Sequence, residues 1–205
     1  MDMAMKHTFG ALALVLLTTI TQAQEWKPGS TDWRSLPEAK RSKLGLYLTP
    51  QQAFDTMQKE GAKTLFLDIR TRAEAMYVGM PSNVDALVPY VEHPELMSDW
   101  DEKRHMYALE PNQDFVPELE RRLREKGLGK DAAIILICRS GDRSAKAADR
   151  LQAAGYGKVY SVTEGFEGDM GKEGGQTGRR AVNGWKNANL PWSYQLDKAK
   201  MYFPR

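Results

Sequence analysis

The chain has 205 residues, and its 29 Lys and Arg side chains nearly balance its 27 Asp and Glu side chains, for a net charge of +2. Because these charges are interspersed along the chain, the composition indicates no nucleic-acid partner. A single cysteine excludes an internal disulfide, so packing alone has to stabilise the fold. HExxH, CxxC and His-rich patterns are absent from the sequence, and we expect neither a metal site nor a cofactor.

The first 23 residues have the pattern of a cleaved signal peptide. Lys6 and His7 form a short basic start, residues 9–20 form an apolar run, and residues 21–23 (TQA) offer the small side chains that a signal peptidase reads. The apolar run is too short to span a bilayer, although a membrane anchor or a buried first helix is the alternative. We therefore expect export to the periplasm and no membrane attachment after cleavage.

The rest of the chain divides by composition into three parts. Residues 24–44 are polar and interrupted by Pro and Gly, which indicates an N-terminal extension. Residues 45–195 alternate apolar and amphipathic segments, which predicts one domain, and residues 196–205 are expected to form a C-terminal tail.

Within the domain, short apolar strands alternate with helices. Thr49, Pro50 and Gln52 have the pattern of a helix start with a capping box. The polar residues 90–112 interrupt the alternation and predict a hairpin-like insertion. This alternation predicts an α/β fold with a mostly parallel sheet. The expected strands are 64–67, 84–88, 132–137 and 159–162, and the expected helices are 50–60, 71–77, one around 115–123, and 144–154.

Two groups of reactive or charged side chains follow buried strands. Asp68 and Arg70 come after the strand at 64–67, and Cys138 comes after the strand at 132–137. Because the carboxyl ends of parallel strands meet at one edge of a sheet, we expect the two groups to lie at the same edge.

The segment after Cys138 indicates a reactive thiol. A lone cysteine after an apolar strand is by default a small buried hydrophobic side chain. Here residues 139–143 (RSGDR) lead into a helix expected to begin near Ser144, so the backbone N–H groups of the loop should converge into an anion-binding nest. With Arg139 and Arg143 close by, this nest is expected to favour the thiolate form of Cys138.

Several ordered motifs resemble the rhodanese-like sulfurtransferase family. Residues 138–144 (CRSGDRS) are similar to its CRSGxRS active loop, and Asp68, Arg70 and Glu74 match its D-x-R-x-x-x-E pattern. Residues 164–168 (EGFEG) and 184–191 (GWKNANLP) resemble its GGF and GWxxxxLP endings. The chain departs from the family in having Gly-Met-Pro at residues 79–81, where Gly-His-Ile is usual. The resemblance covers roughly residues 47–192.

The resemblance implies an exported single-domain rhodanese, with a doubly wound, mostly parallel sheet and helices on both faces. It implies a sulfurtransferase that moves a sulfane sulfur from a small thiosulfate-like donor to a thiol or cyanide acceptor through a persulfide on Cys138. An exported protein is a possible further partner. Asp68 and Arg70 are expected to support the loop, with a purely structural role as the alternative. The expected substrate-binding residues are Arg139, Ser140, Gly141, Asp142, Arg143 and Ser144.

Two other functions remain open at this point. Cysteine phosphatases space their Cys and Arg as C-x5-R, whereas Arg143 comes one residue earlier and Ser144 takes the phosphatase position. The shorter loop predicts a pocket for a single sulfur atom and disfavours a phosphatase or arsenate reductase. A non-catalytic sulfur carrier, or a binding module for an exported partner, is the other alternative. The presence of Cys138 disfavours an inert module but does not exclude a carrier.

Overall fold

The computed structural model describes residues 32–204 as an α/β domain around one five-stranded parallel sheet. The strand order is β1-β10-β9-β2-β4, so β2 and β9 lie side by side in the interior of the sheet. These strands are β1 (Tyr47–Leu48), β2 (Thr64–Asp68), β4 (Ala86–Leu87), β9 (Ala133–Ile137) and β10 (Val159–Val162).

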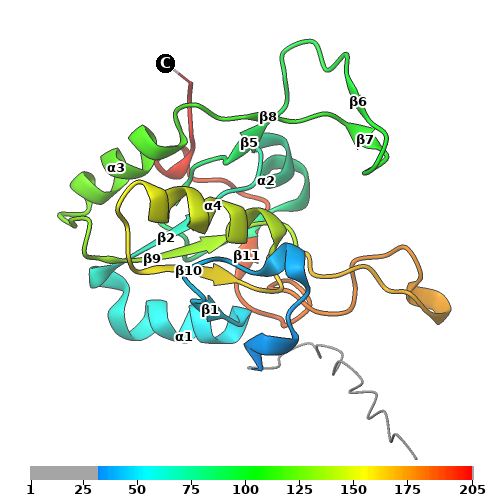
Figure 1. Cartoon of the computed structure of the whole chain (residues 1–205), viewed down its shortest axis with the longest axis horizontal. Coiled ribbons are helices and arrows are strands. Elements are labelled where there is room, and N and C mark those ends of the chain that lie inside the picture. The colour runs from blue at the N-terminus through cyan, green and yellow to red at the C-terminus, as the bar shows by residue number, and fades with distance from the viewer. Residues whose placement is uncertain (1–31, 205) are drawn as a thin grey trace, which may run out of the picture.

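Helices cover both faces of this sheet (Figure 1). Alternate residues of a buried strand point to opposite faces, and Leu65 and Phe66 accordingly belong to two different apolar clusters. One cluster packs under α3 and α4, and the other under α1 and α2. The predicted parallel α/β architecture with helices on both faces is confirmed. The helices are α1 (Pro50–Glu60), α2 (Arg72–Val78), α3 (Phe115–Glu125) and α4 (Asp142–Ala153).

Local sequence signals explain most element boundaries. The predicted capping box at the start of α1 is present, because Thr49 Oγ1 accepts a hydrogen bond from the Gln52 N–H and Gln52 Oε1 accepts one from the Thr49 N–H. The strand predicted at 84–88 is shorter, since ladder pairing is limited to Ala86–Leu87 and Pro89 has no N–H to extend it. The 3-10 turns are η1 (Trp33–Ser35), η2 (Glu38–Lys40), η3 (Gly61–Lys63), η4 (Gly174–Gln176) and η5 (Lys198–Lys200).

The insertion predicted at 90–112 is an antiparallel arm, here called the insertion arm (residues 91–111). Its base pairs β5 (Val91–Glu92) with β8 (Glu110–Pro111), and its tip pairs β6 (Trp100–Asp101) with β7 (Met106–Tyr107). The arm projects away from the sheet (Figure 1). A separate ribbon pairs β3 (Met80–Pro81) with β11 (Trp192–Ser193).

Residues on both flanks of the predicted domain pack against it. Leu36 is fully buried, and the Lys43 N–H donates to Asp149 on α4. At the other end, Arg122 on α3 donates to the carbonyls of Ala199 and Met201. The structure therefore joins parts of the expected extension (24–44) and tail (196–205) to the same packing unit. The expected signal peptide, residues 1–23, lies outside the described residues. No helix within residues 32–204 combines the length and the apolar character that crossing a membrane requires.

The loop after β10 holds the loop after β9 in place by backbone contact. The N–H groups of Phe166 and Glu167 donate to the carbonyls of Cys138 and Arg139, at 2.8 and 3.0 Å. Gly165, directly before Phe166, has φ +63°, and a Cβ atom there would approach the Arg139 carbonyl carbon to 2.5 Å. The position of the Cys138 loop therefore depends on the absence of a side chain at residue 165.

We predict that Gly165→Ala destabilises the protein more than Gly155→Ala does. Both glycines have a positive φ, which costs an alanine about 1–2 kcal/mol, but a Cβ at Gly155 would meet no atom within 4 Å. The backbone clash at Gly165 should add about 1–3 kcal/mol to the loss. Urea unfolding of the two variants measures the difference, and equal losses would contradict the close approach.

Candidate active site

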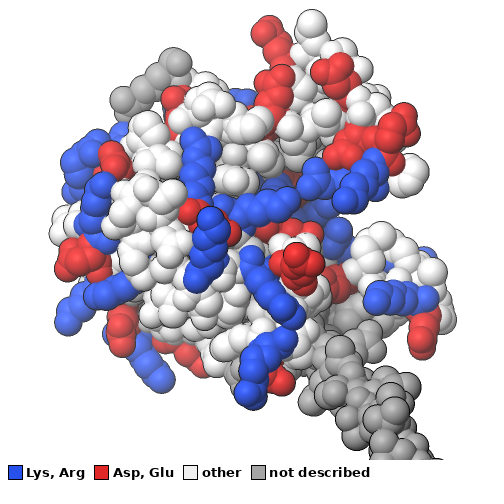
Figure 2. Space-filling view, viewed as in Figure 1, with Lys and Arg blue, Asp and Glu red and all other residues white. Residues whose placement is uncertain are grey.

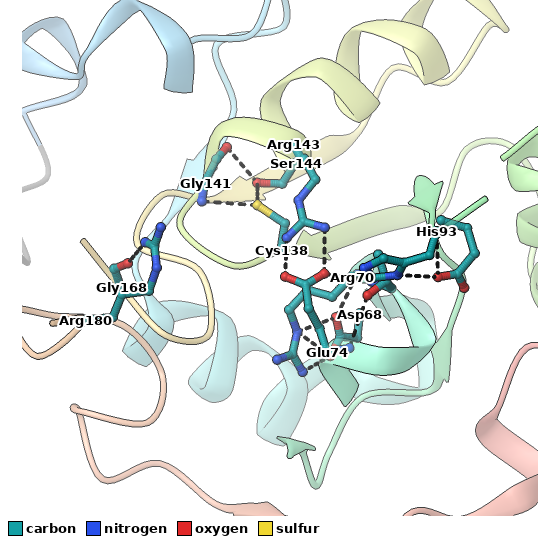
Figure 3. Close-up of polar contacts among 12 residues, drawn as sticks. Asp68, Arg70, Glu74, His93, Cys138, Gly141, Arg143, Ser144, Gly168 and Arg180 are labelled. Carbon is teal, nitrogen blue, oxygen red and sulfur yellow. Dashed lines mark hydrogen bonds and ion pairs between the residues drawn. The ribbon is translucent and has the colours of Figure 1, made fainter. Parts of the chain in front are cut away.

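The thiol of Cys138 lies in the turn between β9 and α4. Only 1% of this residue is exposed, and its Sγ accepts a hydrogen bond from the Gly141 N–H at 3.1 Å (Figure 3). Gly141 has φ +103°, and a Cβ atom there would lie 2.2 Å from the Thr163 carbonyl oxygen. Glycine is therefore required for the turn that aims this N–H at the sulfur. The helix begins at Asp142, two residues before the predicted start at Ser144, because Gly141 forms its N-cap.

The hydroxyl of Ser144 lies on another side of the sulfur. Its Oγ is 3.5 Å from Cys138 Sγ, donates to the Gly141 carbonyl at 2.9 Å and contacts Ser161 Oγ at 2.7 Å. Ser144 and Ser161 are both fully buried. A serine has one hydroxyl proton, so Ser144 can donate to a thiolate only by turning away from the Gly141 carbonyl. Ser161 was not predicted from the sequence, because a serine within a strand carries no motif.

Arg143 is held by Glu74 and does not point freely into the site. Its two terminal nitrogens donate to the two carboxylate oxygens of Glu74 at 2.7 and 2.5 Å, and both side chains are 17% exposed. Burial by itself raises the pKa of Glu74, but the hydrogen bonds and the charge of Arg143 outweigh it and hold this pKa at about 2. Burial by itself lowers the pKa of Arg143, and Glu74 more than reverses that effect. The sequence predicted a substrate-binding role for Arg143, whereas its described contacts position α4 against α2.

Glu74 was quoted from the sequence only as part of a motif. It also closes a capping box at the start of α2, because its Oε2 accepts a hydrogen bond from the Thr71 N–H at 2.9 Å. The T-x-x-E pattern of residues 71–74 could have indicated this local role. Its pairing with Arg143, 69 residues later, depends on tertiary structure.

Asp68 and Arg70 form a buried pair that supports the Cys138 loop indirectly. Both side chains are fully buried, and the Arg70 guanidinium pairs with Asp68 at 2.5 Å and donates to the Gly79 carbonyl at 2.7 Å. The same guanidinium stacks 4.0 Å from the centre of the Phe166 ring. Because the Phe166 N–H binds the Cys138 carbonyl, the pair acts on the loop through Phe166. The predicted position at the same sheet edge is confirmed, since Asp68 is the register partner of Ile137.

The remaining loop residues, Arg139, Ser140 and Asp142, are accessible. The carbonyl of Arg139 accepts hydrogen bonds from the next loop, but its side chain has no hydrogen bond or ion pair to any residue between 32 and 204. Asp142 is exposed in the first turn of α4, where a negative charge is favoured by the helix dipole. Ser140 and Asp142 line a cavity.

The surroundings allow thiol chemistry in which backbone groups stabilise negative charge. The described hydrogen-bond contacts of Sγ are the Gly141 N–H and the Ser144 hydroxyl, and neither is a base. His93, a side chain that could act as a base, is not one of these contacts. It lies beside Glu92, where its Nδ1 is 3.6 Å from a carboxylate oxygen. Among residues 32–204, no three His, Cys, Asp or Glu side chains gather in a way that could hold a metal ion. The arrangement suits a sulfur nucleophile whose charge is met by a backbone donor at a helix N-terminus.

Comparison with known proteins identifies the family. The "Uncharacterized protein RP600" of Rickettsia prowazekii is 30% identical over 128 residues, which cover 62% of this chain and 81% of that protein. Its homolog from Rickettsia rickettsii is 31% identical over 130 residues, with the same coverage. The crystal structure of Rv0390 from M. tuberculosis is 28% identical, covers 72% of this chain and 96% of its own, and has a TM-score of 0.54. The family model of the rhodanese-like domain matches residues 49–171. The chain therefore belongs to the rhodanese-like domain family.

Proposed function

We propose that this protein is a sulfurtransferase that carries a sulfane sulfur on Cys138. The observation that carries the proposal is the hydrogen bond from the Gly141 N–H to Sγ, in a turn that leads into a helix N-terminus. A donor of this kind stabilises a thiolate and also the negative charge of a persulfide. Membership of the rhodanese-like domain family supports the same chemistry.

The proposed reaction has two displacements at one sulfur. The Cys138 thiolate attacks the outer sulfur of a thiosulfate-like donor, a new S–S bond forms, and the donor's S–S bond breaks, so that sulfite leaves with the electron pair. An acceptor, either a thiolate or cyanide, then bonds to the outer sulfur of the persulfide, and the electron pair of the broken S–S bond returns to Cys138. Arg139 is proposed to meet the donor's sulfonate, because its guanidinium is unpaired among the described residues and directly follows the nucleophile.

The state of Arg143 argues against the phosphatase or arsenate reductase alternative. A phosphatase loop needs a guanidinium that is free to hold the oxyanion. Here two nitrogens of Arg143 are bound to the Glu74 carboxylate. A non-catalytic carrier or a binding module for an exported partner stays the second candidate, because a carrier needs the same buried cysteine.

We also propose that the protein acts in the periplasm after removal of residues 1–23. The proposal depends on the sequence pattern of that segment.

The first test of the proposed function is the mass of the protein after incubation with thiosulfate. The wild-type chain should gain one sulfur atom, and Cys138→Ser should gain none, because the persulfide requires the thiol. Intact-mass spectrometry measures the gain. If the wild-type chain gains no sulfur from any sulfane donor, the sulfurtransferase proposal fails and the binding module takes its place.

The ion pair between Glu74 and Arg143 predicts a pH dependence of stability. The folded pKa of Glu74, about 2, is below its ordinary value of 4.5, so the stabilisation is complete above pH 4.5 and is lost as the pH falls towards 2. The shift corresponds to about 3 kcal/mol at neutral pH. In Glu74→Gln, which can still close the capping box, the unfolding free energy should lack this part of the pH dependence.

Glu125→Gln is the control for this measurement, because Glu125 also pairs with an arginine but its side chain is 52% exposed. An exposed pair should contribute less than about 1 kcal/mol, so this variant should follow the wild-type curve. A Glu74→Gln curve parallel to the wild-type curve between pH 4.5 and 2 would show that the pair does not stabilise the fold.

The proposed location predicts the N-terminus of the mature protein. Protein recovered from the periplasmic fraction should begin at Gln24 or a close neighbour, as N-terminal sequencing can show. Recovery of intact Met1 in the membrane fraction would instead make the segment an anchor.

A further inference from the structure

Two buried hydroxyls lie next to each other behind the sulfur of Cys138. Ser144, on α4, and Ser161, on β10, are fully buried, and their Oγ atoms are 2.7 Å apart. Ser144 Oγ also lies 3.5 Å from Cys138 Sγ and 2.9 Å from the Gly141 carbonyl oxygen (Figure 3). Ser161 therefore reaches the nucleophile through Ser144, from the strand beside the one that leads to Cys138.

The number of hydroxyl protons determines which of the two serines donates. Each serine has one hydroxyl proton. Among residues 32–204, Ser144 Oγ is the described hydrogen-bond partner of the Ser161 side chain. If Ser144 donated to Ser161, the Ser161 proton would be buried without an acceptor, which is unfavourable. Ser161 therefore donates to Ser144, and the Ser144 proton stays free for another acceptor.

The Ser144 proton has two acceptors to choose from, the Gly141 carbonyl and the sulfur. The Gly141 carbonyl does not depend on Ser144, since it also accepts a hydrogen bond from the Ala145 N–H at 3.2 Å. When Cys138 is a thiol, Ser144 donates to this carbonyl, and its oxygen can accept the S–H group. When Cys138 is a thiolate, the charged sulfur is the stronger acceptor. The Ser144 proton can then turn to Sγ and leave no backbone group unpaired.

The hydrogen bond from Ser161 makes Ser144 a better donor and a poorer acceptor. A hydroxyl that accepts a hydrogen bond is polarised, so the hydrogen bond that it donates becomes stronger. The thiolate gains from the stronger donor, and the thiol loses part of its acceptor, so both effects favour the thiolate. They are larger in the interior than at the surface, because a low dielectric leaves electrostatic interactions unscreened.

Charged side chains act on the same sulfur from other directions. Burial lowers the pKa of Arg143, and the charges of Glu74, Cys138 and Asp68 raise it further, so this guanidinium lies within electrostatic reach of the sulfur. Basic side chains also gather on the surface between the insertion arm and the hairpin of residues 169–182, where solvent and salt screen them (Figure 2). The other charged groups around the loop are Lys40, Arg70, Arg139, Asp142, Asp169 and Arg180. A substitution of Ser161 changes none of these charges.

We propose that Ser161 is a positioning residue that acts through Ser144 to favour the thiolate form of Cys138. Ser161 donates to Ser144, Ser144 donates to the thiolate, and the Gly141 N–H donates to the same sulfur. The proton of the thiol passes to solvent. The inference goes beyond the proposed function, because it concerns the free thiol whatever reaction that thiol performs.

The ultraviolet absorbance of the thiolate tests the proposal, because Cys138 is the single cysteine of the chain. The spectrum of Cys138→Ser at the same pH is subtracted to remove the absorbance of the aromatic side chains. At a pH where the wild-type thiol is half ionised, Ser144→Ala should lower the thiolate-to-thiol ratio about 10- to 100-fold, since a hydrogen bond to a charged group is lost. Ser161→Ala should lower it about two- to fivefold, since only the polarisation of that hydrogen bond is lost.

A double-mutant cycle shows whether Ser161 acts through Ser144. In the Ser144→Ala background, Ser161→Ala should change the ratio less than about 1.5-fold, because the hydroxyl that it polarises is absent. The same loss in both backgrounds would overturn the action through Ser144. A wild-type ratio in the single variant Ser161→Ala would overturn the inference as a whole.

Ser161→Thr and Ser161→Val test the hydroxyl in side chains of nearly the same shape, and they decide the question if Ser161→Ala folds poorly. Threonine keeps the hydroxyl donor and valine replaces it with a methyl group. Ser161→Thr should therefore have a thiolate-to-thiol ratio about two- to fivefold higher than Ser161→Val. Equal ratios would assign any change to packing and contradict the inference.

Thr163→Val is the matched control. Thr163 is also fully buried and follows β10 directly, but its hydroxyl donates to the Leu48 carbonyl at 3.4 Å. In urea unfolding this variant should lose stability as Ser161→Ala does, because each loses a buried hydrogen bond. Its thiolate-to-thiol ratio should stay within about 1.5-fold of the wild-type ratio, since the Ser161–Ser144 contact is intact. A fall as large as that of Ser161→Ala would overturn the specific role of Ser161.

Sulfur loading from thiosulfate separates this inference from the proposed function. A chain that gains no sulfur but shows the Ser161 effect would refute the sulfurtransferase proposal and keep the positioning role. A chain that gains sulfur although Ser161→Ala has the wild-type ratio would have the opposite meaning. In a chain that shows both, Ser161→Ala should slow loading about two- to fivefold at low pH and approach the wild-type rate at high pH, because the thiolate is the nucleophile.

Discussion

The site depends on the backbone contact between the loop after β10 and the loop that carries Cys138. The carbonyls of Cys138 and Arg139 accept hydrogen bonds from residues 166–168, and Gly165 leaves no side chain to keep the two loops apart. These hydrogen bonds fix the two carbonyls, and the turn that follows them ends with the Gly141 N–H donating a hydrogen bond to the sulfur of Cys138. Two glycines with positive φ, at residues 141 and 165, make this arrangement possible. The two family motifs, CRSGDRS and EGFEG, are therefore the two sides of one backbone contact between these loops.

The arginines around the thiol fall into two groups. Arg70 is buried and Arg143 is nearly buried, and each is paired with a carboxylate, of Asp68 and Glu74 respectively. The pairing is needed because a buried guanidinium without a partner would be strongly destabilising. They hold the sheet edge and the helix in place, so little of their charge is available to a substrate. Arg139 and Arg180 have no ion pair to any residue between 32 and 204. The charge that can meet an anionic sulfur compound is therefore on the side of the loop away from Glu74.

Under the proposed function, this division lets one loop serve chemistry and recognition separately. The sulfur, the Gly141 N–H and the Ser144 hydroxyl are held by buried contacts that leave little freedom for change. The insertion arm and the hairpin of residues 169–182 lie on the surface, and each is closed at its base by a short antiparallel pairing of its own two strands or ends. Surface segments of this kind tolerate variation, so they can adapt the site to a donor, an acceptor or a partner without disturbing the nucleophile.

The sequence by itself determined most of the elements, and it predicted the loop chemistry and the nucleophile. Apolar runs, the capping box at Thr49 and the glycine after Ser140 are local signals, and a local signal needs no knowledge of distant residues. The insertion arm was predictable for the same reason, since polar residues interrupted a regular alternation.

Only the tertiary structure decided which charges meet. Arg143 lies near Cys138 in sequence, and this proximity predicted a substrate-binding role. The fold, however, brings Glu74 from 69 residues away to bind its guanidinium. Arg180 carried no motif, and only the fold places it at one cavity with Ser140 and Asp142 of the Cys138 loop. Ion pairing depends on distance and burial, and the order of residues along a chain specifies neither until the chain has folded.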